Sequence, residues 1–248
     1  MKPQSPTSLD LIAHADRLLA QGKHLEAVST YKQALRQDPE NPDILNNLGT
    51  CLYMIGNLQE ARSMYRRAIS VDPKHVRAVF NLATLHQLMQ EFPRASRYFR
   101  LTITIDPSHY ESYTRLVTCL LSLGDVRGAI RAYKGALTLQ PDNTHVMQEI
   151  ASLSAEIGKY PQSVRYFKMA IACEPKNAHL WGNLALVYRQ QAKFTDARKA
   201  LLTAIQINPE LAHLHYALGS LDELEGRHKE ALAHIQRAYE LDPSLKEE

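Results

Sequence analysis

The stretch ISVDPKHVRAVFNLA, residues 69–83, decides the fold of this chain. A short aliphatic run ends at Asp72-Pro73, and a second run with apolar periodicity starts directly after this pair. Proline cannot continue a helix and biases the residue before it away from helix, so the pair predicts a helix end and a turn. It recurs every 34 residues, always after Asp, Gln, Glu or Asn, at Pro39, Pro73, Pro107, Pro141, Pro175, Pro209 and Pro243.

The fixed period predicts a chain of helical hairpins. We number each 34-residue repeat so that its recurring proline is at position 32. Position 8 is then a small residue in six of the seven repeats, for example Gly49, and position 20 is small in all seven, for example Ala61. Position 24 is large, for example Tyr65. Small residues let two antiparallel helices approach closely, and the large residue fills the space toward the next hairpin. Glycines such as Gly56 at position 15 suit the left-handed end of the first helix. With the proline at position 32, the repeats are 8–41, 42–75, 76–109, 110–143, 144–177, 178–211 and 212–245.

This pattern resembles the tetratricopeptide repeat family over residues 8–245, and NNLGTCLYMIGNLQEARSMYRRAISVDP (46–73) is close to a consensus repeat. The resemblance implies an all-α, right-handed superhelical solenoid of seven helix-turn-helix repeats, with first helices lining a concave groove that binds protein. We expect one solenoid domain over 8–245, a flexible segment over 1–7 and a short tail over 246–248. Position 11, usually Tyr in the family, carries His86, Ser154 and Asp222, and we expect those hairpins to pack less well.

No motif predicts an enzyme, a cofactor or a metal site: there is no phosphate loop, no dinucleotide fingerprint and no H-E-x-x-H. His145, His179 and His213 share position 2 and suggest a histidine ladder for metal or pH sensing. Adjacent first helices lie roughly 10 Å apart, so two imidazoles could hardly share one ion, and exposed polar residues are the favoured interpretation. The cysteines do not suit a disulfide framework.

Composition favours a cytoplasmic protein, because the N-terminus lacks the apolar core of a signal peptide and no apolar run is long enough to span a membrane. A net charge of +3 is too weak to indicate nucleic acid.

In the resembling family, positions 2, 5, 6, 9, 12 and 13 face the groove. Position 6 carries Asn47 and Asn81, and an amide there can pair with an extended peptide backbone. This is similar to the asparagine ladder in the superhelix of O-GlcNAc transferase. Threonines at position 9 keep the groove floor polar, with apolar and arginine side chains between them. The predicted partner-binding groove comprises Asn46, Asn47, Thr50, Tyr53, Met54, Arg77, Phe80, Asn81, Thr84, Arg115, Thr118 and Leu121.

The second helices carry a basic stripe, which suggests an alternative function. It would make the chain a targeting or recruitment subunit that holds an acidic partner or makes a peripheral contact with an anionic membrane. A further alternative is a substrate-capturing arm of a separate enzyme, and a solvated outer face is the plainer interpretation. The stripe comprises Lys32, Arg66, Arg97, Arg100, Arg131, Lys134, Arg165, Lys168 and Lys199.

The C-terminal repeat predicts weak self-association. A solenoid needs a polar cap, and only SLKEE follows Pro243. We therefore expect Ile235, Tyr239 and Leu241 to face solvent or a second copy, in a dimer of micromolar affinity.

Overall fold

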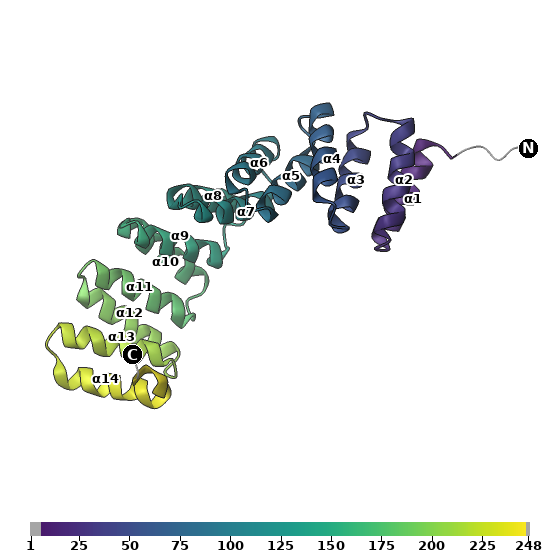
Figure 1. The fold of residues 1–248 in the computed structure, drawn as a ribbon. Coiled ribbons are helices and arrows are strands. Elements are labelled where there is room, and N and C mark those ends of the chain that lie inside the picture. Colours follow the sequence, from purple (N-terminus) through teal and green to yellow (C-terminus); the bar gives the residue numbers. More distant parts are fainter. Residues whose placement is uncertain (1–5, 247–248) are drawn as a thin grey trace, which may run out of the picture. The chain divides into compact units, whose positions relative to one another are not determined.

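The structure of the chain is a computed structural model that describes residues 6–246. Within this range it contains fourteen α-helices, one short 3₁₀ helix and no strand (Figure 1). Each odd-numbered helix begins at the first position of a predicted repeat. The helices are α1 Ser8–Ala20, α2 His24–Gln37, α3 Pro42–Met54, α4 Leu58–Val71, α5 Val76–Leu88, α6 Phe92–Ile105, α7 Tyr110–Ser122, α8 Val126–Leu139, α9 Thr144–Glu156, α10 Tyr160–Cys173, α11 Ala178–Gln190, α12 Phe194–Ile207, α13 Ala212–Leu224, α14 His228–Leu241 and η1 Pro243–Lys246.

The chain divides within α8 into two compact units, unit 1 up to Ala132 and unit 2 from Tyr133. In unit 1, α2 packs on α3, α4 on α5 and α6 on α7. In unit 2, α10 packs on α11 and α12 on α13. The hairpins of each unit therefore stack in chain order, which confirms the predicted all-α solenoid of helix-turn-helix repeats. The single domain over 8–245 stays a prediction.

Most of the predicted flexible segment 1–7 lies outside the described residues, as do residues 247–248 of the predicted tail. The structure does place Thr7, whose hydroxyl caps α1 by accepting from the backbone N–H of Asp10. The Asp10 carboxylate accepts in return from the Thr7 backbone N–H at 3.0 Å. This reciprocal pair of bonds fixes where the first helix begins.

The helices end where the sequence predicts. Helix α4 ends at Val71, the Asp72 backbone N–H closes its last turn on the Ala68 carbonyl at 2.9 Å, and α5 begins three residues after Pro73. Gly56 follows α3 with φ +81°, the left-handed conformation expected at position 15. Gln90 and Ala192 hold that place in repeats 3 and 6 with φ 57° and 56°. The turn geometry is therefore kept where glycine is absent.

The core of each hairpin is built from the predicted small and large positions. A Cβ added to Gly49 would lie only 2.7 Å from Tyr65 Cε1, so the aromatic ring lies against the backbone of α3. Ala27 and Ala61 are fully buried, and Phe99 is buried completely. The close approach of the two helices in a hairpin thus depends on a small residue at position 8, and in repeat 2 on glycine.

The polar residues at position 11 are buried with polar partners, contrary to the expectation of poorer packing. His86 Nδ1 lies 2.6 Å from a carboxylate oxygen of Glu91. The Ser154 hydroxyl donates to the Ile150 carbonyl at 2.5 Å. Asp222 is paired with Arg198 from the preceding hairpin. A buried polar group costs little when its hydrogen bonds are made.

The C-terminal residues fold back on α14 instead of leaving its face open. Helix η1 contacts α14, and Lys246 Nζ lies 5.7 Å from the centroid of the Tyr239 ring. Ile235, Tyr239 and Leu241 are half-buried, and Ile235 and Tyr239 line a shallow surface hollow, so whether they meet a second copy stays a prediction. Leu232, one turn before Ile235, is 68% exposed.

Candidate binding surfaces on the first helices

A chain of side-chain hydrogen bonds links α1, α3 and α5 in unit 1. Asn47 Nδ2 donates to Asp16 Oδ1 at 3.3 Å, and Asn46 Nδ2 donates to Asn47 Oδ1 at 3.0 Å. Asn81 Nδ2 donates to Asn46 Oδ1 at 2.9 Å. We call Asp16, Asn46, Asn47 and Asn81 the amide chain. The structure therefore brings three of the predicted site residues together.

Asn46 has a different role from the one predicted. It is only 3% exposed, so its amide is used inside the protein and cannot meet a ligand. Its position between Asn47 and Asn81 fixes the orientation of both. Asn47 and Asn81 are half-buried and keep unused hydrogen-bonding capacity. Asn47 has one N–H beyond the bond to Asp16, and Asn81 Oδ1 accepts no hydrogen bond from the described residues.

The predicted threonines separate into different environments. The Thr50 hydroxyl donates to the Asn46 carbonyl at 3.1 Å and accepts from Tyr65 at 3.4 Å, so it supports the amide chain. The Thr84 hydroxyl is buried without a hydrogen-bond partner among the described residues. Thr118 is exposed, and its hydroxyl donates back to the helix. Of the three, only Thr118 presents its side chain fully to solvent.

The two predicted arginines are each held by an acid. Arg77 pairs with Asp43, one repeat earlier. Arg115 Nε donates to Glu111 at 2.7 Å, and its guanidinium carbon lies 5.6 Å from the centroid of the Phe80 ring. Arg115 and Phe80 therefore form a second cluster, between α5 and α7. Neither arginine offers an unneutralised charge to a ligand.

Apolar side chains lie exposed near the C-terminal ends of the first helices. Met54 is 55% exposed and Leu88 is 54% exposed, and both occupy position 13 of their repeats. Their helices, α3 and α5, contact each other. Leu121 is exposed on α7, whereas Tyr53 is half-buried and packs on the core of unit 1. Met54 and Leu88 lie two helical turns, about 10 Å, from Asn47 and Asn81 along the same helices.

Unit 2 has an apolar hollow of about 290 Å³ on α11 and α13, which the sequence interpretation missed. Leu186 and Tyr216 line it, each 40% exposed. A Cβ added to Gly182, another lining residue, would lie 2.7 Å from Leu214 Cδ2, so glycine keeps this part of the wall thin. A signal was present in the sequence, because position 9 is Leu186 in repeat 6, where five other repeats carry a hydroxyl. We call this the α11–α13 hollow.

Two of the three position-2 histidines meet beside this hollow. The rings of His179 and His213 stack with centroids 5.5 Å apart, and His213 lines the hollow. Burial lowers the pKa of His213, and the neighbouring His179 lowers it further. The lowered pKa favours the neutral imidazole, which suits an apolar wall. Among residues 6–246 no group of three or more His, Cys, Asp or Glu side chains could hold a metal ion.

Family models for the tetratricopeptide repeat match residues 12–73, 55–110 and 183–245. Further models of the same description match residues 166–199 and 110–143. No protein with a curated description is significantly similar to the chain in sequence. None of the described helices combines the length and hydropathy that a membrane span requires.

Solved structures share the fold. The match to the MamA protein has 24% sequence identity and a TM-score of 0.59, and it covers 69% of this chain and 94% of the MamA chain. YrrB, described as a protein with an unusual peptide-binding site, is 18% identical, covers 72% of this chain and 92% of its own, and has a TM-score of 0.58. A chain in the structure of Naa15/Naa10 bound to HypK-THB is 13% identical and has a TM-score of 0.79, covering 95% of this chain and 37% of its own. At these identities the likeness concerns the fold alone.

Proposed function

Because the chain belongs to the tetratricopeptide repeat family, we propose that it is a non-enzymatic scaffold whose first helices bind an extended or helical segment of a partner protein. The observation that carries this proposal is the amide chain, with exposed Met54 and Leu88 two turns further along the same helices. The fold is generally a non-catalytic interaction module, and YrrB, a structural neighbour, is described as having an unusual peptide-binding site.

The amide chain suits the backbone of a partner segment more than its side chains. Asn47 has a second N–H beyond the bond to Asp16, close to the Tyr31 hydroxyl, and Asn81 retains a carbonyl acceptor. A peptide unit in an extended segment carries the complementary acceptor and donor, whatever its side chain. The internal bonds to Asp16 and Asn46 hold both amides in place, so little side-chain entropy is lost on binding. Met54 and Leu88 would then add apolar contacts with the side chains of the partner segment, and these contacts would give specificity for its sequence.

We expect Met54→Glu combined with Leu88→Glu to weaken binding of a partner segment at least tenfold. Both side chains are more than half exposed, so the change leaves the fold intact while placing charge on the apolar part of the surface. The ligand would be a peptide selected by phage display against the natural chain, and calorimetry would give its affinity. This pair is a cleaner test than Asn47→Ala with Asn81→Ala, because loss of the Asn81 side chain leaves the buried side-chain oxygen of Asn46, Oδ1, without its donor.

The matched control is Leu25→Glu with Leu101→Glu, which adds the same charge at exposed leucines on the second helices α2 and α6. It should change the peptide's affinity less than threefold. Equal losses in the two pairs would remove the first-helix surface of unit 1 from the proposal. A loss produced by Leu186→Glu alone would move binding to the α11–α13 hollow.

We also propose a weak homodimer through α14. Leu232 is largely exposed, and it borders a shallow hollow of about 340 Å³ with Ile235 and Tyr239. Because η1 already covers part of this face, a dimer should have micromolar affinity, roughly 8 kcal/mol. Sedimentation equilibrium over a dilution series would measure it, and Leu232→Glu should abolish it. A strict monomer at about 100 μM would contradict the proposal.

A further inference from the structure

Five arginines on the second helices of unit 1 line two adjoining hollows. The first hollow, of about 430 Å³, is lined by α4 alone. The second, of about 380 Å³, lies among α4, α5 and α6 and shares Arg62 and Arg66 with the first. We call them together the arginine hollows. Their arginines are Arg62, Arg66, Arg67, Arg94 and Arg97.

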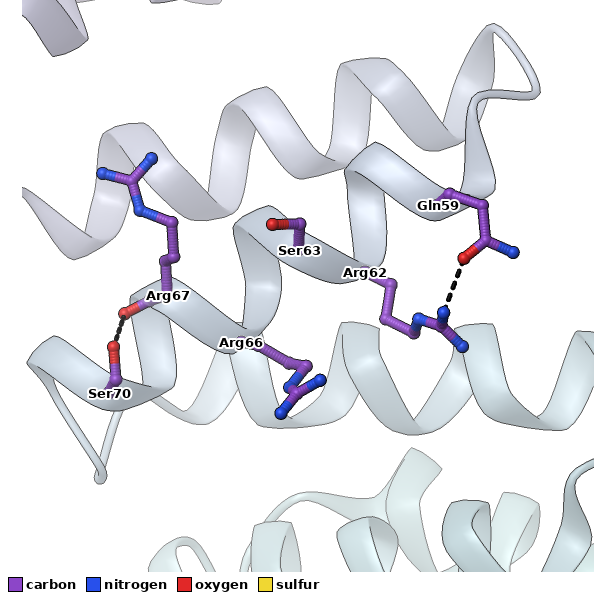
Figure 2. Close-up of a pocket in the computed structure, with 6 residues that line it drawn as sticks. All are labelled: Gln59, Arg62, Ser63, Arg66, Arg67 and Ser70. Carbon is purple, nitrogen blue, oxygen red and sulfur yellow. Dashed lines mark hydrogen bonds between the residues drawn. The ribbon is translucent and has the colours of Figure 1, made fainter.

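These guanidinium groups are poorly neutralised. Among the described residues, Arg66 and Arg97 have neither an ion pair nor a hydrogen bond, and Arg62 donates only to the neutral side chain of Gln59. Arg94 pairs with Glu91 at 3.0 Å, the one carboxylate among the described residues that pairs with any of the five, and Arg67 donates to the Pro39 carbonyl at 3.2 Å. Figure 2 shows the guanidinium groups of Arg62 and Arg66 on the same side of α4, while Arg67 extends to the opposite side.

Elsewhere four residues of the basic stripe are engaged, whereas Arg131, Lys168 and Lys199 have no partner among the described residues. Arg100 lies 3.9 Å from Asp125, and Lys32 lies 3.6 Å from Glu60. Lys134 lies 5.8 Å from the centroid of the Tyr166 ring. The arginine hollows differ because several unpaired guanidinium groups line one recess. Like charges held together repel each other, so the arrangement favours a bound anion that would remove the repulsion.

We propose that the arginine hollows bind a phosphorylated side chain of a partner protein. A phosphate monoester carries a charge of about −1.5 to −2 at pH 7 and three strong acceptor oxygens. Guanidinium groups donate to such oxygens in a bidentate fork, and two or three of them are needed to neutralise the dianion. Arg66, Arg97 and Arg62 have this donor capacity unused. A single carboxylate would neutralise only one of them, so phosphate is the better match in charge.

Other anionic surfaces match the hollows less well. No exposed apolar side chain lines either hollow, so nothing there could enter a bilayer. Binding of single-stranded nucleic acid commonly uses free aromatic faces on which bases stack. The one tyrosine present, Tyr98, is half-buried and stacks on His86 with centroids 5.5 Å apart and planes 7° apart. The hollows therefore favour an anion on a protein segment.

The experiment compares two libraries of nine-residue peptides, one with phosphoserine fixed at the centre and one with serine. Arrayed on a surface, they are probed with the whole chain at physiological salt. Anisotropy with labelled single peptides then gives affinities. We expect the best phosphopeptides to bind at least tenfold tighter than their serine twins. Arg66→Gln with Arg97→Gln should remove that preference.

The matched control is Arg127→Gln with Arg131→Gln, two exposed arginines on α8 that have no partner among the described residues and line no hollow among those described. It removes the same charge from the same unit and should change phosphopeptide affinity less than threefold. Equal losses in both variants would mean non-specific attraction and would overturn the proposal. Equal binding of phosphoserine and serine peptides, or binding only to phosphatidylserine vesicles or to a single-stranded oligonucleotide, would also overturn it.

The same assay separates this proposal from the proposed function. Met54→Glu with Leu88→Glu alters the first-helix surface and should leave phosphopeptide binding within threefold. If the phosphopeptides respond to that pair and not to the arginine variant, they occupy the first-helix surface and the arginine hollows have no such ligand.

Discussion

Replacing Phe99 with alanine should lower the free energy of unfolding of unit 1 by about 3–5 kcal/mol. Phe99 occupies position 24 of repeat 3 and is completely buried. Its ring centroid lies 5.7 Å from that of Phe80, on the neighbouring helix α5. Truncation removes this contact and leaves a cavity that the flanking hairpins cannot close, since both are anchored by their own aromatic residues.

Urea denaturation followed by far-ultraviolet circular dichroism would measure the loss, and hydrogen exchange would place it in α5–α7. The control is Phe99→Leu, because repeat 6 already carries Leu201 at the same position. A hydrophobic change of similar volume usually costs less than about 1.5 kcal/mol. A Phe99→Ala variant as stable as Phe99→Leu would mean that position 24 does not determine how hairpins pack.

Replacing Arg198 with methionine should destabilise unit 2 by about 3 kcal/mol, since it breaks a buried ion pair from one side. Arg198 on α12 pairs with Asp222 on α13, whose side chain is 0% exposed. The arginine also lies 2.6 Å from Glu225. Without it, the one ion pair that Asp222 keeps among the described residues is with the more distant Arg227, at 3.4 Å. A buried carboxylate with one long ion pair is poorly compensated.

The double variant Arg198→Met with Asp222→Leu should recover most or all of the lost stability. Leucine is the residue at this position in repeats 1, 2 and 4, and hydrophobic replacement of a whole buried pair is often neutral or stabilising. The measurement is again urea denaturation, with hydrogen exchange in α12–α14. A double variant no more stable than the single one would show that Asp222 contributes through contacts other than the arginine.

The candidate site was only partly predictable. The family's positional pattern identified Asn47 and Asn81 as groove residues, and the structure links them through one hydrogen-bond chain. Neighbouring residues on a helix differ in burial by their angle about the axis, and the sequence pattern did not separate buried Asn46 from half-buried Asn47. The α11–α13 hollow was missed because it depends on side chains that are absent, at Gly182 and Ala217, as much as on those present.

The sequence by itself determined the repeat, because each of its signals acts locally. Proline at a boundary, glycine in a left-handed turn and small residues at positions 8 and 20 restrict the backbone over a few residues. Recurrence every 34 residues then leaves few alternatives to stacked hairpins.

Only the tertiary structure decided which polar side chains are used inside the protein and which remain for a partner. Asn46 and Asp222 find partners 35 and 24 residues away along the chain, on other helices, at distances set by how the helices pack. Arg66 and Arg97 find none among the described residues. A sequence column treats Arg66 and Arg100 alike, because it records charge and not the distance to the nearest acid. That distance decides whether a charge is neutralised within the fold or is available to a ligand.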